Sequence, residues 1–311
     1  MSEHLILAGT NKAGSTAVFR YLGDHPNVSV SRLKESGFFY KSLDLASENL
    51  DEMRVRYRSQ FLGSGPNIRV FVEATPQYLR GGQEIARRIF RILPDAKLMF
   101  ILRSPTDRVV SFYRSRHGQL HLPVHELTSE RFVKEAIVAA QCESSETDSL
   151  STREKVFRQE IEAGHYADHL SSYLETFGTE RVLVTFYDLL SVAPYELMSE
   201  ICGFVGIESH FYTDYNFRIE NRTRTHRSAY VRRVAGRLNF RFEPFLNRFP
   251  AFRRAGRDLY DLLNVDKNKQ IEFTSSSRTE LDAYFAPWNR ALRDLMAENY
   301  PQKQLPSWLQ S

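Results

Sequence analysis

The sequence predicts an α/β protein: a single-domain parallel sheet flanked by helices. Short apolar runs alternate along the chain with longer segments whose apolar residues recur at helical spacing. That alternation is typical of a parallel sheet with helices on both faces. The 311 residues are 42% hydrophobic and 26% charged, a composition that supports one extended α/β core.

The first predicted element is a buried strand at residues 4–8. A turn bounded by Gly9 and Gly14 follows it, and a helix begins near Ser15. Such a turn directs backbone N–H groups and the positive end of the helix dipole at one point, where phosphate or sulfate can bind. In the nucleoside-triphosphate version of this loop, a lysine comes directly after the second glycine. Here Ser15 occupies that place and the lysine is Lys12, so we expect a P-loop-like nucleotide-binding core for another anion.

The other elements follow in alternation. Further strands are expected at residues 28–30, 69–73, 97–102 and 181–186, and helices at 15–24, 46–60, 82–92, 105–116, 130–140, 153–177 and 194–204. Parallel sheets bind ligands at the carboxyl ends of their strands, so polar motifs placed there are candidate site residues. We expect one domain over residues 1–311, with a core at about 4–210, an arginine-rich variable region at about 212–275 and a C-terminal helix at about 277–299.

Several segments occur in an order that is characteristic of one family. They are Gly9-x-x-Lys12-x-Gly14-Ser15-Thr16, Lys34-Glu35-Ser36-Gly37-Phe38-Phe39, Glu73-Ala74-Thr75-Pro76-Gln77-Tyr78, Arg103-Ser104-Pro105 with Ser111, and Gly164-His165-Tyr166. Together they span about residues 5–190. The set resembles the sulfotransferases that use 3′-phosphoadenosine 5′-phosphosulfate (PAPS), and is nearest to the heparan-sulfate-type and bacterial branch.

The resemblance implies a role for each segment. The 5′-phosphosulfate is bound by Lys12, Ala13, Gly14, Ser15 and Thr16, and Lys12 also acts in catalysis. Arg103 and Ser111 bind the 3′-phosphate. Glu35 is the catalytic base, which removes a proton from the acceptor. A later basic loop would close over the 3′-phosphate, and the candidates are Arg222, Arg224 and Arg227.

Most of these residues also have a structural alternative. Ser15 and Thr16 could do no more than cap the helix that follows the turn. Arg103 could form an ion pair with Asp107 instead of binding a nucleotide. A second candidate for the base is His117, which would make Glu35 an ordinary surface carboxylate.

Charge and composition add weaker indications. The net charge is only +4, yet twelve arginines lie between Arg218 and Arg257, either as an anion-binding surface or as a solvated face. No motif supports nucleic-acid binding. Between Tyr230 and Phe252 arginines alternate with apolar residues, which favours a cover over an acceptor pocket or weak membrane-surface contact. The two cysteines, Cys142 and Cys202, predict free thiols.

The sequence also bears on the cellular location of the protein and on membrane and metal binding. No apolar run is long enough to span a bilayer, and the N-terminus lacks the features of a signal peptide, so we expect a cytoplasmic protein. No metal-ligand cluster is visible, so no metal is expected. The oligomeric state stays open.

The function that the resemblance implies is transfer of a sulfuryl group from PAPS to a hydroxyl or amine, leaving PAP. The heparan-type enzymes carry a lysine where this chain has Ala74, and they carry paired cysteines that it lacks. We therefore expect a small-molecule, glycan or lipid-linked acceptor rather than a glycosaminoglycan. Two alternatives stay open: a P-loop small-molecule kinase, and a non-enzymatic anion- or membrane-surface-binding protein.

Overall fold

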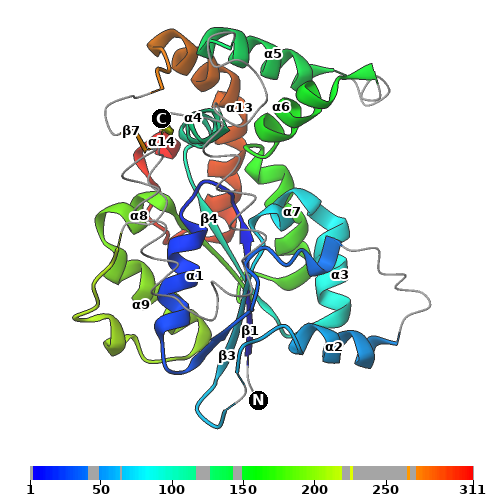
Figure 1. Cartoon of the computed structure of the whole chain (residues 1–311), viewed down its shortest axis with the longest axis vertical. Helices are drawn as coiled ribbons and strands as arrows, with labels where there is room; N and C mark the ends of the chain where they lie inside the picture. Colours follow the sequence, from blue (N-terminus) through cyan, green and yellow to red (C-terminus); the bar gives the residue numbers. More distant parts are fainter. Residues whose placement is uncertain are drawn as a thin grey trace.

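A five-stranded parallel sheet forms the centre of the molecule (Figure 1). The computed structural model describes residues 3–40, 49–63, 65–116, 127–142, 149–218, 225–226, 265–266 and 271–310. The strands, in the sheet order β2-β3-β1-β4-β5, are β1 (Glu3–Gly9), β2 (Val28–Val30), β3 (Val70–Ala74), β4 (Lys97–Leu102) and β5 (Val182–Phe186). All neighbouring pairs are parallel, which confirms the predicted fold class.

Helices fill most of the intervals between the strands. They are α1 (Ser15–Asp24), α2 (Leu50–Arg58), α3 (Gly82–Ile92), α4 (Pro105–Arg116), α5 (Ser129–Gln141), α6 (Thr152–Glu162), α7 (Tyr166–Phe177), α8 (Tyr187–Val192), α9 (Pro194–Val205), α13 (Ser275–Asn299) and α14 (Ser307–Gln310). Short 3₁₀ helices are η1 (Phe38–Tyr40), η2 (Pro76–Gly81) and η4 (Ser209–Tyr212). A two-residue ribbon pairs β6 (Thr225–His226) with β7 (Val265–Asp266).

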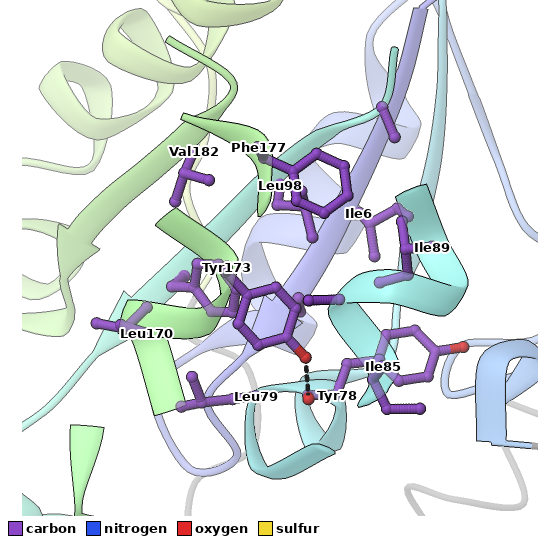
Figure 2. Packing of buried hydrophobic residues seen from close by; sticks show 14 of the residues in the cluster. Ile6, Tyr78, Leu79, Ile85, Ile89, Leu98, Leu170, Tyr173, Phe177 and Val182 are labelled. Carbon is purple, nitrogen blue, oxygen red and sulfur yellow. Dashed lines mark hydrogen bonds between the residues drawn. The ribbon is translucent and has the colours of Figure 1, made fainter. Parts of the chain in front are cut away.

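Alternate residues of β1 face opposite layers of helices. Ile6 and Ala8 are buried in a cluster with α3 and α7, whereas Leu5 and Leu7 are buried in a cluster with α1 and α9. Figure 2 shows the first cluster, in which the Tyr173 hydroxyl donates a hydrogen bond to the backbone carbonyl of Tyr78. The strand is thus buried on both faces, and its carboxyl end is held between the two layers.

A third apolar cluster lies beyond the carboxyl ends of the strands. It joins α4, α5, α6 and α13 through buried residues such as Phe112, Phe132, Phe157 and Phe285. In Figure 1 the N-terminus lies at the lower end of the sheet, and α4 and α5 lie at the opposite end. The loops that carry the sequence motifs therefore lie between the sheet and this helical group.

Two predicted helices need correction. The segment predicted as one helix over 153–177 forms two, α6 and α7, separated by a turn at Gly164. There the Gly164 N–H bonds to Ile161, and a Cβ on Gly164 would approach Phe285 Cε1 to 2.7 Å. Tertiary packing thus ends the first helix, which helical periodicity alone does not reveal. The helix predicted over 46–60 spans Leu50–Arg58, and residues 41–48 lie outside the described part of the chain.

The remaining boundaries agree closely with prediction. The C-terminal helix runs from Ser275 to Asn299 where 277–299 was expected, and the last strand begins at Val182 rather than 181. Helix α8, at the carboxyl end of β5, was not predicted. Of the arginine-rich region, the structure describes little beyond its first residues.

Candidate active site

The turn between β1 and α1 has the shape that the sequence predicts. Lys12 and Gly14 both have positive φ, 63° and 83°, and a Cβ on Gly14 would overlap the Leu190 side chain. Gly14 is the N-cap of α1 and makes no side-chain capping bond. The alternative that Ser15 or Thr16 caps this helix is therefore wrong. The first N–H groups of α1 are left for an anion.

A buried ionic network holds this turn against α4 and α6. The Arg108 guanidinium is fully buried, and its Nη1 lies 2.8 Å from Oε2 of Glu160 and 3.2 Å from Oδ1 of Asn11. Asn11 also donates to both Glu160 carboxylate oxygens at 3.4 Å. The residue next to Lys12 is thus fixed by side chains from α4 and α6, far away in the sequence.

Lys12 is partly buried and lies close to charges of both signs. Burial lowers the pKa of Lys12, and the positive charges of Arg116 and Arg108 lower it further, while Glu160 and Glu35 act in the opposite direction. An anion close to the Lys12 ammonium would favour its charged form and so offset both the burial and the positive charges. The position therefore suits a group that binds and stabilises negative charge.

Arg103 lies beside the same turn, at the carboxyl end of β4. Its Nη1 donates to the backbone carbonyl of Lys12 at 3.0 Å, and its guanidinium stacks over the Tyr187 ring at 4.5 Å. Its Nε is buried and has no hydrogen-bond partner in the described part of the chain. Asp107 instead pairs with Arg278 at 2.8 Å, so the alternative of an Arg103–Asp107 ion pair is wrong.

Ser111 lies on α4, in the helix that starts two residues after Arg103, and is half-buried. An arginine and a hydroxyl can both contact one phosphate. The pairing of Arg103 with Ser111 at the 3′-phosphate stays a prediction.

Glu35 approaches the turn from another side. It lies in the segment that follows β2, has a φ of 64°, and bonds through its N–H to the Ala74 carbonyl at the end of β3. Its carboxylate pairs with Lys34 at 2.6 Å and accepts a bond from Gln77 at 3.2 Å. The side chain is 46% exposed, so a substrate can reach it.

The pKa of Glu35 lies below its ordinary value. Burial acts to raise it, but the hydrogen bonds from Lys34 and Gln77 and the charges of Lys34 and Lys12 outweigh that effect. The aromatic residues Phe38 and Phe39 are buried beneath the loop and do not dehydrate the carboxylate enough to reverse the shift. Glu35 is therefore ionised at neutral pH, as a proton acceptor must be.

Some predicted residues cannot be placed. His117, Arg222, Arg224 and Arg227 lie outside the described residues. The choice between Glu35 and His117 as base therefore stays a prediction, and so does the closure of arginines over the 3′-phosphate.

The structure adds neighbours for which no role was predicted. Tyr187 holds the Arg103 guanidinium, and Gln77 holds Glu35, while Asn11 joins the turn to the buried network. Gln77 belongs to a motif already visible in the sequence. Tyr187 directly follows a predicted strand, and this position at a strand end was the one sequence signal that could have placed it in the site.

Within the described residues, no group of three or more metal-binding side chains occurs, and no helix is both long and apolar enough to cross a membrane. Cys142 and Cys202 are free thiols.

The fold and the site together define an α/β protein with an anion-binding turn at the carboxyl end of its central strand, an arginine beside that turn, and a carboxylate facing it. Residues 2–229 match the model of the sulfotransferase domain, which covers most of the chain. The chain belongs to the sulfotransferase domain family and is a transferase enzyme.

Its relatives agree with this assignment. The chain is 25% identical over 308 residues to the bifunctional heparan sulfate N-deacetylase/N-sulfotransferase 1 of Caenorhabditis briggsae, covering 98% of this chain and 31% of the relative. It is 29% identical over 209 residues to the enzyme of the same name from Mus musculus, covering 66% of this chain and 22% of the relative. The chain thus spans about a third or less of these relatives.

A solved structure shares the fold. The sulfotransferase from Alicyclobacillus acidocaldarius matches with a TM-score of 0.60 at 19% identity, covering 99% of both chains. At this identity the likeness concerns the fold only.

Proposed function

We propose that this enzyme transfers a sulfuryl group from PAPS to a hydroxyl or amine of its acceptor, releasing PAP. One observation carries the proposal: Lys12, Arg103 and Glu35, which come from three separate segments, meet around the turn at the carboxyl end of β1. A cation, an arginine and an exposed ionised carboxylate are the groups that such a transfer needs.

The residues present fit the donor. The uncapped N-terminus of α1 and Lys12 would hold the 5′-phosphosulfate, and the Arg103 guanidinium, with Ser111, would hold the 3′-phosphate. When bound, PAPS supplies an activated sulfuryl group. Lys12 and the N–H groups of the turn would stabilise the negative charge that develops on the departing phosphate.

Glu35 would act on the acceptor. The Lys34 and Gln77 contacts orient its carboxylate, and its lowered pKa keeps it ionised, so it can accept the proton of the attacking hydroxyl or amine. The Glu35 side chain is 46% exposed, which leaves room for an acceptor.

The acceptor class rests on the surroundings of Glu35. Leu33 and Tyr40 lie on either side of Glu35 in the sequence and are 68% and 44% exposed. Exposed apolar and aromatic side chains in the same segment as the proposed base favour an acceptor with an apolar or ring-shaped body, such as a glycan or a lipid-linked alcohol. The relatives' names include heparan sulfate, which makes an amine-bearing glycan a second acceptor to test.

The first experiment is calorimetric titration with PAP, AMP and ATP with magnesium. We expect PAP to bind far more tightly than AMP, because AMP lacks the 3′-phosphate. Preferential binding of ATP with magnesium would contradict the proposal and favour the kinase.

The second experiment measures transfer from ³⁵S-labelled PAPS to four acceptors: 4-nitrophenol, octyl glucoside, N-desulfated heparin and water. Glu35→Gln keeps the shape of the side chain but removes the proton acceptor. It should lower turnover by about 10²–10⁴ and leave PAP affinity within a few-fold of wild type. Glu52→Gln, an exposed carboxylate on α2, is the matched control and should change neither.

His117→Ala tests the other candidate base in the same assay. Loss of turnover in His117→Ala with normal turnover in Glu35→Gln would reverse the assignment. A cytoplasmic location and a single-domain organisation stay predictions of the sequence.

A further inference from the structure

We propose that Glu73 is the positioning residue of the reaction: it fixes the loop that carries Glu35 by orienting three hydroxyl groups. This inference rests on the proposed role of Glu35 and adds a residue that does not itself touch either substrate.

Glu73 occupies a position in β3 where an apolar side chain would be expected. Its neighbours in the strand, Val72 and Ala74, are buried apolar residues, and Glu73 is itself 0% exposed. Burying a carboxyl group is costly unless hydrogen bonds compensate it. A buried acid at the end of a core strand therefore points to a specific task.

Three hydroxyl groups converge on one oxygen of this carboxyl. Oε1 accepts hydrogen bonds from Ser36 at 2.8 Å, Thr75 at 2.6 Å and Tyr78 at 3.0 Å. The other oxygen, Oε2, is buried and lacks a partner of good geometry among the described residues. Burial raises the pKa of Glu73, although the nearby hydroxyls of Thr75, Ser36, Tyr78 and Tyr57 oppose the shift.

Each of the three hydroxyls bonded to Oε1 also accepts one backbone N–H of the loop. Thr75 accepts from Gly37 at 3.3 Å, Ser36 from Phe38 at 3.3 Å, and Tyr78 from Phe39 at 3.2 Å. Three consecutive amides immediately after Glu35 and Ser36 are therefore held by three hydroxyls that share one carboxyl oxygen.

The chemistry of a hydroxyl explains why the carboxyl matters. A hydroxyl carries one proton and two lone pairs, so donation to Glu73 leaves its lone pairs for the loop amides. Without the carboxyl, the three protons have no common acceptor and each hydroxyl can rotate. Glu73 thus fixes the direction of all three bonds at once.

The loop needs such support because Glu35 adopts an unfavourable backbone conformation. A non-glycine residue at a φ of 64° is strained, and the surrounding contacts must offset this strain. The Glu35 N–H bond to Ala74 anchors one side of this residue, and the three amide bonds anchor the other. Loss of these bonds would let the Glu35 carboxylate move, and a displacement of about 1 Å can cost on the order of a hundredfold in rate.

The test uses Glu73→Leu, Glu73→Gln and Ser36→Ala in the full chain. Turnover is measured with ³⁵S-labelled PAPS and whichever of the acceptors named above the wild-type chain uses best. PAP affinity is measured by calorimetry, and exchange of the amides of residues 37–39 by hydrogen–deuterium exchange. Thr185→Val, which removes another fully buried hydroxyl of the sheet, on β5, is the matched control.

Positioning predicts a split between chemistry and donor binding. Glu73→Leu should lower kcat by about 10–100-fold and speed exchange of residues 37–39, while PAP affinity stays within twofold. Glu73→Gln keeps one acceptor oxygen and should fall between Glu73→Leu and wild type. Ser36→Ala preserves the core, so it should give a smaller loss of kcat even if Glu73→Leu folds poorly. Thr185→Val should leave kcat and loop exchange unchanged.

Two results would overturn the inference. One is wild-type kcat in Glu73→Leu or, if that variant fails to fold, in both Ser36→Ala and Glu73→Gln. The other is a parallel loss of PAP affinity and kcat, which would indicate general damage. If Glu35→Gln itself turns over normally, the proposed base has failed instead, so the two failures are distinguishable.

Discussion

The donor-side turn, residues 9–16, and the acceptor-side loop, residues 31–39, face each other across the site but are supported in different ways. The donor-side turn rests on a buried ion pair between Arg108 and Glu160. The acceptor-side loop carries its ion pair, Lys34 with Glu35, at the surface, and hydroxyl groups hold its backbone. A buried ion pair thus supports the donor-side turn, whereas neutral hydroxyl groups support the acceptor-side loop.

The difference matches what the proposed reaction requires of each side. The donor-side turn must present N–H groups and a cation in fixed positions where negative charge develops, and burial strengthens such interactions. The acceptor-side loop must keep its carboxylate ionised and within reach of an incoming proton, which requires exposure. We therefore expect changes on the donor side to affect stability, nucleotide affinity or the stabilisation of the leaving phosphate. Changes on the acceptor side should affect turnover and its pH dependence without loss of nucleotide affinity.

The largest effect is expected from Arg108→Met. It leaves the Glu160 carboxylate buried without its partner, so the free energy of unfolding should fall by about 3–5 kcal/mol. Denaturant titration measures this loss. Arg278→Met is the matched control: its pair with Asp107 has the same 2.8 Å distance but is well exposed, so we expect a loss of at most about 1 kcal/mol. Equal losses would show that burial of the pair is unimportant.

Lys12→Ala should come next. Because the ammonium is most useful when the leaving phosphate gains charge, turnover should fall by about 10²–10³ while PAP binding weakens less. Single-turnover kinetics beside calorimetry separate the two effects. Lys134→Ala, an exposed lysine on α5, should change neither. Normal turnover in Lys12→Ala would mean that the turn binds an anion without contributing to catalysis.

A smaller effect is expected from Arg103→Ala. A charge-assisted hydrogen bond contributes about 1.5–3 kcal/mol, so PAP should bind at least about tenfold more weakly. AMP, which lacks the 3′-phosphate, should lose much less. Ser111→Ala should reproduce the same selectivity without disturbing the Lys12 carbonyl, and the exposed Arg87→Ala serves as the control. Equal losses for PAP and AMP would refute the assignment of Arg103.

The smallest effect is expected from Lys34→Met, which tests the role of Glu35 on the acceptor side. Although burial acts to raise the pKa of Glu35, Lys34 helps to hold it below its ordinary value, so Lys34→Met should raise it. Glu35 must be ionised to accept a proton, and the acid limb of the kcat/KM profile should therefore move to higher pH. Lys134→Met should leave the limb in place. A shift to lower pH would mean that Glu35 does not set this limb.

Much of the architecture was predictable because it depends on local patterns. Strands β1 and β4 are continuous apolar runs, and the turn after β1 requires the glycine that the motif supplies at Gly14. The break at Gly164 was missed because it depends on packing against Phe285 rather than on helical periodicity.

The sequence by itself determined the fold class, the family and the positions of Lys12 and Arg103 just after strands, since periodicity and motif spacing are properties of neighbouring residues. Only the tertiary structure decided what surrounds them. It joined Asn11 to Arg108 and Glu160, placed Tyr187 beneath Arg103, and gathered Ser36, Thr75 and Tyr78 on Glu73. These contacts join distant segments through buried polar groups, and a pattern of neighbouring residues carries no record of which partner each group will meet.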